Sequence, residues 1–184
     1  VDLLVNLDEN KIDGFLLDSA FYSAIRWEKN GYCAIESDKT RPSEFAFATS
    51  STDKGNKINK ELNEFIAKMN ENGGTKKLAD KWFSGTRPTE FEDYKSLTGE
   101  NGTIHVGMTD TDPPFSYQDD DVLTGFDLEY IILFAREYGY KNVGLILDRG
   151  YFSIGNIKYF DEKNYDFLMM IKNNSVLVAD KLKD

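Results

Sequence analysis

The sequence predicts an α/β fold, because segments with the period of a strand alternate along the chain with segments that have the period of a helix. The clearest helix is expected over 56–71, where apolar residues form one stripe on a polar cylinder. The members of this stripe are Ile58, Leu62, Phe65, Ile66 and Met69. Of the 184 residues, 40% are hydrophobic and 14% aromatic, which is enough to build a core.

Four shorter elements are expected before that helix. The segment 11–18 resembles a buried strand that ends on an acid, and 19–31 continues with helical spacing of its apolar residues. A short strand is expected at 31–37. Another is expected at 41–51, because large apolar side chains alternate along it.

The chain after 56–71 is marked by glycines and prolines. Gly73 or Gly74 can adopt the left-handed conformation that ends a helix, and a short second helix should follow. The segment 86–102 is polar and contains Pro88, so it is expected to be a linker with one weak helix.

The second half is expected to begin with a strand at 103–109 and a helix at 123–140, whose first turn is acidic. The segment between them, 110–121, is expected to be a loop because tandem prolines do not fit a central strand. In the tail, a strand is expected at 143–148, a helix at 153–164 and a second strand at 165–172.

Composition excludes several functions. The net charge of −10 leaves no excess of cations to neutralise phosphates, so a nucleic acid is not expected as partner. Cys33 is the only cysteine and His105 the only histidine, which gives no zinc cluster and favours a structural histidine. We expect no metal, no cofactor and no catalysis. No apolar run is long enough to span a bilayer.

Three stretches resemble type II extracytoplasmic (periplasmic) solute-binding proteins, which capture amino acids for ABC transporters. The stretch 44–85, "EFAFATSSTDKGNKINKELNEFIAKMNENGGTKKLADKWFSG", resembles the end of such a protein. "NKIDGFLLDSAFY" (10–22) resembles the strand before that end. "GTIHVGMTDTDPPFSYQDDDVLTGFDLEYIILFAREYGY" (102–140) resembles the family's beginning. The order is therefore the end of one module followed by the start of another.

The resemblance implies a periplasmic-binding-protein-like lobe, a three-layer α/β sandwich, for which a circularly permuted order of the segments is an open alternative. Residues 1–40 would end a second lobe, 41–85 would return to the first lobe, 86–102 would link, and 103–184 would start a following module. Our hypothesis is that the strand at 44–49 shares a sheet with the strand at 103–109 and the tail strands. Helices 56–71 and 125–138 would then cover the faces of that sheet.

The tail at 143–184 carries a second resemblance. "LILDRGYFSIGNIKYFDEKNYDFLMMIKNNS" resembles part of the catalytic domain of insertion-sequence transposases, in which Asp148 would be one of three metal-binding acids. No partner motif for Asp148 is present, and the net charge opposes DNA binding. We therefore expect an α/β fragment here rather than a transposase.

Amino-acid recognition needs an acid for the ammonium, a cation for the carboxylate, and walls for the side chain. The resemblance assigns the first role to Asp18, whose alternative role is to cap the helix that starts at Ser19. It assigns the pocket loop to Phe115 and Tyr117, with packing as the alternative for Phe115. The remaining candidates follow the predicted strand at its carboxyl end, where open α/β sheets bind ligands. They are Thr109, Asp110 and Asp112.

The family's carboxylate-binding arginine is missing. The corresponding stretch 169–183 contains no arginine, and Arg41 and Arg149 do not match in position. A buried carboxylate without a partner costs several kcal/mol, so we expect no tight amino-acid binding by this chain. The sequence therefore favours a degenerate or truncated scaffold.

The resemblance implies an extracytoplasmic location, membrane anchoring in the full-length protein, and an ABC transporter permease as partner. Two alternatives stay open: an extracytoplasmic sensor domain that reports to a signalling domain, and a transposase fragment. A homodimer that completes a missing lobe is also possible, because a half-lobe would expose a sheet edge.

Overall fold

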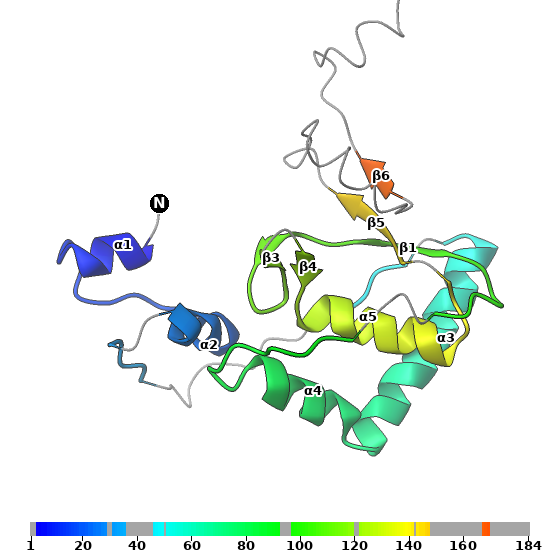
Figure 1. The fold of residues 1–184 in the computed structure, drawn as a ribbon, viewed down its shortest axis with the longest axis horizontal. Coiled ribbons are helices and arrows are strands. Elements are labelled where there is room, and N and C mark those ends of the chain that lie inside the picture. Colours follow the sequence, from blue (N-terminus) through cyan, green and yellow to red (C-terminus); the bar gives the residue numbers. More distant parts are fainter. Residues whose placement is uncertain are drawn as a thin grey trace, which may run out of the picture.

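The computed structural model describes residues 3–28, 31–35, 46–49, 51–92, 97–119, 122–141, 143–147 and 167–169. Their order begins with the helices α1 (Leu3–Asp8), α2 (Ser19–Glu28), α3 (Asp53–Glu71) and α4 (Gly74–Trp82). Four short strands follow, β1 (Ile104–Gly107), β2 (Thr111–Asp112), β3 (Ser116–Asp119) and β4 (Val122–Thr124). The described chain continues with α5 (Phe126–Glu137), β5 (Val143–Leu147) and β6 (Phe167–Met169), as Figure 1 shows. The fold is thus a mixture of helices and small sheets.

The strands form two small sheets. In the parallel sheet, β5 lies between β1 and β6, with Ile104 opposite Val143 and Leu145 opposite Phe167. In the antiparallel sheet, β3 lies between β2 and β4. The prolines at 113–114 occupy the turn of the β2–β3 hairpin, where a missing N–H breaks no ladder bond.

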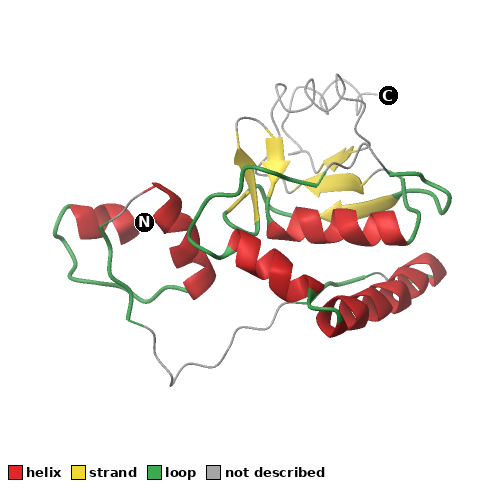
Figure 2. Cartoon of the chain, turned by 60° about the horizontal axis from the view of Figure 1, so that its bottom comes forward, coloured by secondary structure: helices red, strands yellow, loops and turns green. Residues whose placement is uncertain are grey.

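Helix α5 lies between the strands and the other helices of the main body. It contacts both sheets on one side and α4 on the other, so the order of layers is strands, α5, then α3 and α4 (Figure 2). This position explains why α5 is apolar nearly all round: a helix covered on two sides needs apolar residues on both.

The core joins the two halves of the sequence. From α3 it takes Leu62, Phe65 and Met69, which are buried members of the predicted stripe. Phe65 packs its edge against the rings of Tyr130 and Phe134, with ring centroids 5.4 and 5.6 Å apart. The amphipathic α3 is therefore ordered by burial against α5, not by the sheet.

The hairpin is held closely against the start of α5 at Gly125. The backbone N–H groups of Phe126 and Asp127 donate to the carbonyls of Pro114 and Phe115, at 3.0 and 2.8 Å. Gly125 has a φ of 129°, and a Cβ there would lie 2.2 Å from the Phe115 oxygen. Only glycine fits at this position, which fixes the hairpin relative to α5.

Several predicted elements are confirmed within the described residues. Helices cover 19–28, 53–71 and 126–137, and strands cover 104–107 and 143–147. The expected strand at 165–172 is present as β6. Gly73, with a φ of 75°, takes the left-handed conformation between α3 and α4. The expected helix at 153–164 lies outside the described residues.

Other predictions are wrong. The segment 11–18 is not a strand, and neither are the described parts of two other expected strands, 31–35 and 46–49. No neighbouring strand among the described residues covers their apolar residues: Phe47 stacks on Tyr130 at 5.9 Å, whereas Leu16 and Ile35 are 88% and 97% exposed. The described residues of 86–102 contain no helix.

Two further corrections concern the sheets. The segment 110–121, expected to be a loop, contains β2 and β3 of the antiparallel sheet. The hypothesis of a common sheet also fails for 46–49, because this stretch pairs with no strand in either described sheet. The halves meet through helices, and the described helices lie on one side of the parallel sheet (Figure 2). No described helix is long and apolar enough to cross a membrane.

Candidate functional site

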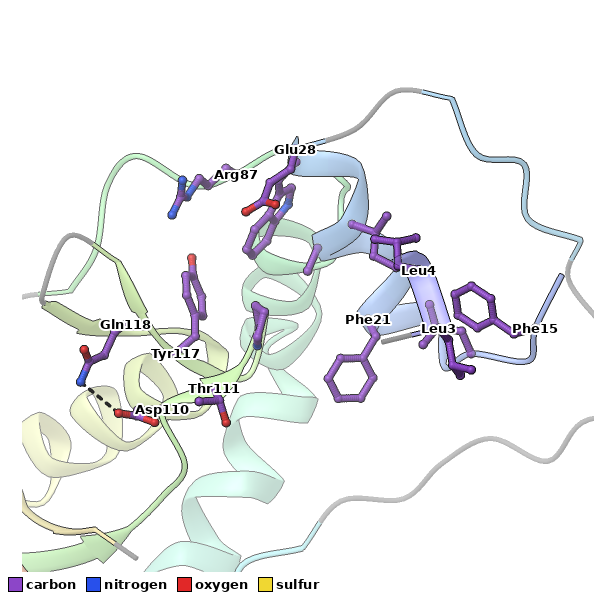
Figure 3. Close-up of a pocket in the computed structure, with 15 residues that line it drawn as sticks. Leu3, Leu4, Phe15, Phe21, Glu28, Arg87, Asp110, Thr111, Tyr117 and Gln118 are labelled. Carbon is purple, nitrogen blue, oxygen red and sulfur yellow. Dashed lines mark hydrogen bonds between the residues drawn. The ribbon is translucent and has the colours of Figure 1, made fainter. Parts of the chain in front are cut away.

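A cavity of about 660 Å³ opens between the two N-terminal helices and the β2–β3 hairpin (Figure 3). One wall is apolar and comes from α1, the following segment and α2. This wall consists of Leu3, Leu4, Phe15, Leu17, Phe21 and Ile25. The other side carries polar groups, and its volume falls in the range of sites for small ligands. The polar lining residues are Glu28, Arg87, Asp110, Thr111, Tyr117 and Gln118.

Helix α2 is fixed to the main body at several points. At its start, the Asp18 carboxylate accepts a hydrogen bond from the Ala20 N–H at 2.9 Å. In its middle, the Ser23 hydroxyl donates to the Phe83 carbonyl just after α4, at 2.8 Å. At its end, the Trp27 ring lies 5.7 Å from the Tyr117 ring. These contacts place Trp27 and Glu28 at the edge of the cavity.

Tyr117 is the most buried aromatic residue that lines the cavity, at 6% exposure. It stands on β3 and points its hydroxyl towards the side on which Arg87 and Glu28 lie (Figure 3). Burial raises the pKa of Tyr117, although the nearby Arg87 guanidinium opposes the shift. Tyr117 therefore stays neutral and can donate its proton at physiological pH.

Arg87 is the cation of the cavity. It forms an ion pair with Asp119 of β3, and its side chain remains 46% exposed. Burial by itself lowers the pKa of Arg87, but the charge of Asp119 and the contact with Tyr117 raise it, and the pKa is raised overall. A guanidinium has five N–H donors, so one carboxylate does not use its full capacity.

Two buried donors that belong to residues lining the cavity have no acceptor among the described residues. They are the Trp27 indole Nε1 and the Tyr117 hydroxyl. The Tyr117 hydroxyl does interact with the Arg87 guanidinium, but a guanidinium cannot accept its hydrogen. Buried donors in proteins are nearly always paired, so these two donors need an explanation. A ligand with acceptor oxygens would provide it.

The floor of the cavity is closed by the hairpin. The Gln118 amide donates to the Asp110 carboxylate at 3.0 Å, and the Gln118 backbone N–H donates to the Asp110 carbonyl at the same distance (Figure 3). This pair orients Asp110 beside Thr111. The arrangement is a set of polar groups that can orient a ligand.

The structure brings some of the predicted site residues to the cavity. Asp110 and Tyr117 line it. Thr109 and Asp112 are outside the lining and bond each other, with the Thr109 hydroxyl donating to the Asp112 carboxylate at 2.7 Å. Asp18 caps α2, which was its alternative role. For these three residues, ligand binding stays a prediction.

Phe115 is also outside the lining. It is 8% exposed and packs against Phe21 and Phe83, with ring centroids 5.6 and 5.5 Å away. This is the packing role that the sequence left open for Phe115. By holding Phe21, it helps to shape the apolar wall.

Sequence reasoning predicted only Asp110 and Tyr117 of the residues that line this cavity, and the most important ones that it missed are Trp27, Glu28 and Arg87. Trp27 and Glu28 end a helix whose apolar stripe was recognised, but the partner of that stripe was unknown. Arg87 lies in the segment expected to be a linker, and its Arg-Pro-Thr context gave no sign of a site.

Among the residues that the structure describes, no group of three or more His, Cys, Asp or Glu side chains could hold a metal ion. Asp148, the acid of the transposase-like tail, lies outside the described residues.

No family model, no curated protein and no solved structure matches this chain. The function must therefore be argued from the cavity and from the sequence.

Proposed function

We propose that this chain is a non-catalytic binding module for a small solute of the amino-acid type, with the ligand in the cavity between α2 and the β2–β3 hairpin. The observation that carries the proposal is the pair of buried donors, Trp27 Nε1 and the Tyr117 hydroxyl, beside the cation of Arg87. Together they supply donors and charge for an anionic oxygen.

The cavity contains all three components that an amino acid requires. Arg87 with the two donors suits the carboxylate, and the carboxylates of Glu28 and Asp110 suit the ammonium. The apolar wall suits a side chain. The arginine that the sequence did not offer at the family's position is thus replaced in space by Arg87, which supports binding rather than a purely degenerate scaffold.

The same proposal includes the fold family of the chain and its location in the cell. A strand, a Pro-Pro-Phe turn, the "GFD" helix and a second parallel strand follow one another from β1 to β5, in the order that the resemblance implies. We propose a periplasmic-binding-protein-like lobe, located outside the cytoplasm, that passes its ligand to an ABC transporter permease. A second copy of the chain could complete the lobe.

A thermal-shift screen of the purified chain against the standard amino acids tests the function. A ligand present at 100 times its Kd should stabilise the folded state by about 2.7 kcal/mol, which raises the unfolding temperature. A response to a subset of amino acids is expected. A flat response across the panel would contradict the proposal.

A further inference from the structure

We infer that the cavity holds its ligand in one orientation and selects an α-amino acid with a large apolar side chain. The carboxylate lies against Trp27, Arg87 and Tyr117, the ammonium against Glu28, and the side chain against the wall formed by α1, 15–17 and α2. This inference rests on the proposed function and adds to it the ligand class and the residues that select it.

The carboxylate end follows from donors that converge from three elements. Trp27 comes from α2, Arg87 from the segment after α4, and Tyr117 from β3. The Trp27 and Tyr117 rings pack against each other, with centroids 5.7 Å apart, so both residues belong to one side of the cavity. A carboxylate has four lone-pair positions and can accept from all three residues at once. A neutral amide or hydroxyl could not satisfy them equally well.

The ammonium end must adjoin the carboxylate end, because an α-amino acid carries both charges on one carbon. Glu28 meets this condition: it follows Trp27 in α2, lines the cavity, and is close enough for its charge to raise the pKa of Arg87. In Figure 3 its carboxylate lies on the same side of the cavity as Arg87 and the Tyr117 hydroxyl. Asp110 is the less suitable acid, since Gln118 already binds its carboxylate.

The apolar end follows from side chains that remain in contact with water. Leu3 is 45% and Leu17 38% exposed, and both line the cavity. Leu3, Leu4 and Phe15 lie on the side of the cavity away from Arg87 (Figure 3). A leucine or phenylalanine side chain would cover this surface and gain from its removal from water. A charged side chain would lose its hydration there without a partner. The cavity is therefore expected to discriminate against glutamate and lysine.

Isothermal titration calorimetry on the whole chain tests the orientation with a panel of related compounds. Phenylalanine is compared with glutamate, with 3-phenylpropanoate, which lacks the ammonium, and with 2-phenylethylamine, which lacks the carboxylate. We expect phenylalanine to bind at least about tenfold more tightly than each of the others, since each lacks one of the three contacts. Tighter binding of 3-phenylpropanoate would assign the cavity to apolar carboxylates and overturn the role of Glu28.

Single substitutions test how much each donor contributes to the affinity while the fold is kept. Tyr117→Phe and Trp27→Phe keep the rings and remove one donor each, and each should weaken phenylalanine binding about tenfold. Arg87→Gln should weaken it about tenfold or more. The matched control is Arg136→Gln: Arg136 is 40% exposed and paired with Glu92 outside the cavity, so the affinity should not change.

The outcomes distinguish a failure of the proposed function from a failure of the inferred ligand orientation and selectivity. If no amino acid binds, the proposed function is wrong and the inference falls with it. If amino acids bind but Tyr117→Phe and Trp27→Phe keep the parent affinity, or glutamate binds best, the inference is wrong while the function stands. Should a variant fail to fold, as judged by urea unfolding, the specificity of the unmodified chain still decides between these outcomes.

Discussion

Glu129 is a buried carboxylate at the centre of aromatic packing. It is 5% exposed and accepts hydrogen bonds from the Trp82 indole at 2.6 Å and from Lys81 at 2.6 and 2.9 Å. The bonds tie α5 to the end of α4 and satisfy the indole N–H of a fully buried tryptophan. A charge at this depth is tolerated because both oxygens of the carboxylate have hydrogen-bond partners.

Removing the carboxylate should therefore destabilise the protein. We expect Glu129→Leu to lower the free energy of unfolding by about 3 kcal/mol, because the Trp82 N–H loses its acceptor and Lys81 its counter-charge. Glu129→Gln should cost less, since the amide oxygen can still accept from Trp82. Urea unfolding measures both. The control is Asp80→Asn, which removes the exposed ion pair with Lys76 and should change stability by less than about 1 kcal/mol.

Asp127 gives the stability a dependence on pH. Burial first, and then the negative charge of Asp112, raise the pKa of Asp127 above its ordinary value of 3.8. As the pH rises through that value, the unfolded chain releases this proton before the folded chain does, so the folded state loses stability relative to the unfolded state. Asp127→Asn removes the effect. The variant should therefore gain stability relative to the parent between about pH 3 and pH 7. If the free energies of unfolding of the two proteins change with pH in the same way across this range, the assignment is wrong.

At the scale of elements, the turn between α3 and α4 depends on one backbone conformation. Gly73 has a φ of 75°, and no atom lies within 4 Å of the position that a Cβ would occupy. A substitution there tests strain without steric conflict. The angle of this turn directs α4 back onto α5 and so positions Trp82.

We expect Gly73→Ala to lower stability by about 1 kcal/mol, because a residue with a Cβ is strained in the left-handed region. Gly73→Asn should cost less, since asparagine tolerates that region. Gly31→Ala is the matched control: its Cβ would also meet open space, and its φ is not positive, so it should be nearly neutral. Thermal or urea unfolding of the three variants gives the comparison. Equal losses for Gly73→Ala and Gly31→Ala would refute the role of strain.

At the scale of the whole molecule, the halves on either side of the 86–102 segment share a core. Both tryptophans of the chain lie in the first half, and both pack against Tyr117 of the second half, at ring-centroid distances of 5.7 and 6.3 Å. Phe65 of α3 packs against α5 in the same way. The two halves are therefore interdependent in the described structure.

Two separate polypeptides, 1–95 and 96–184, should each lack a cooperative unfolding transition, because each exposes half of the core. When mixed, they should associate and shift the tryptophan emission of the first piece to shorter wavelength. Fluorescence titration and analytical ultracentrifugation measure this. If each piece unfolds cooperatively without the other, the chain consists of two independent modules and the interdependence of the halves is refuted.

The sequence by itself determined the elements that are stabilised within their own length. The stripe of α3, the acidic start of α5 and the glycine after α3 predict structure through local periodicity and backbone preference, which need no knowledge of the partner. Segments such as 11–18 have apolar residues but become strands only when another strand supplies hydrogen bonds, and the described chain offers none. Their apolar character therefore led to the wrong prediction of a strand.

Only the tertiary structure decided the candidate site. Asp110 was predicted because it follows a strand, and Tyr117 because its loop resembles the family's aromatic pocket loop; both line the cavity. Trp27, Glu28 and Arg87 join them from segments far apart in the chain, through the packing of α2 on the end of α4 and on the hairpin. Side chains converge on a cavity because helices and strands pack in three dimensions, and that convergence has no counterpart in the spacing of residues along the sequence.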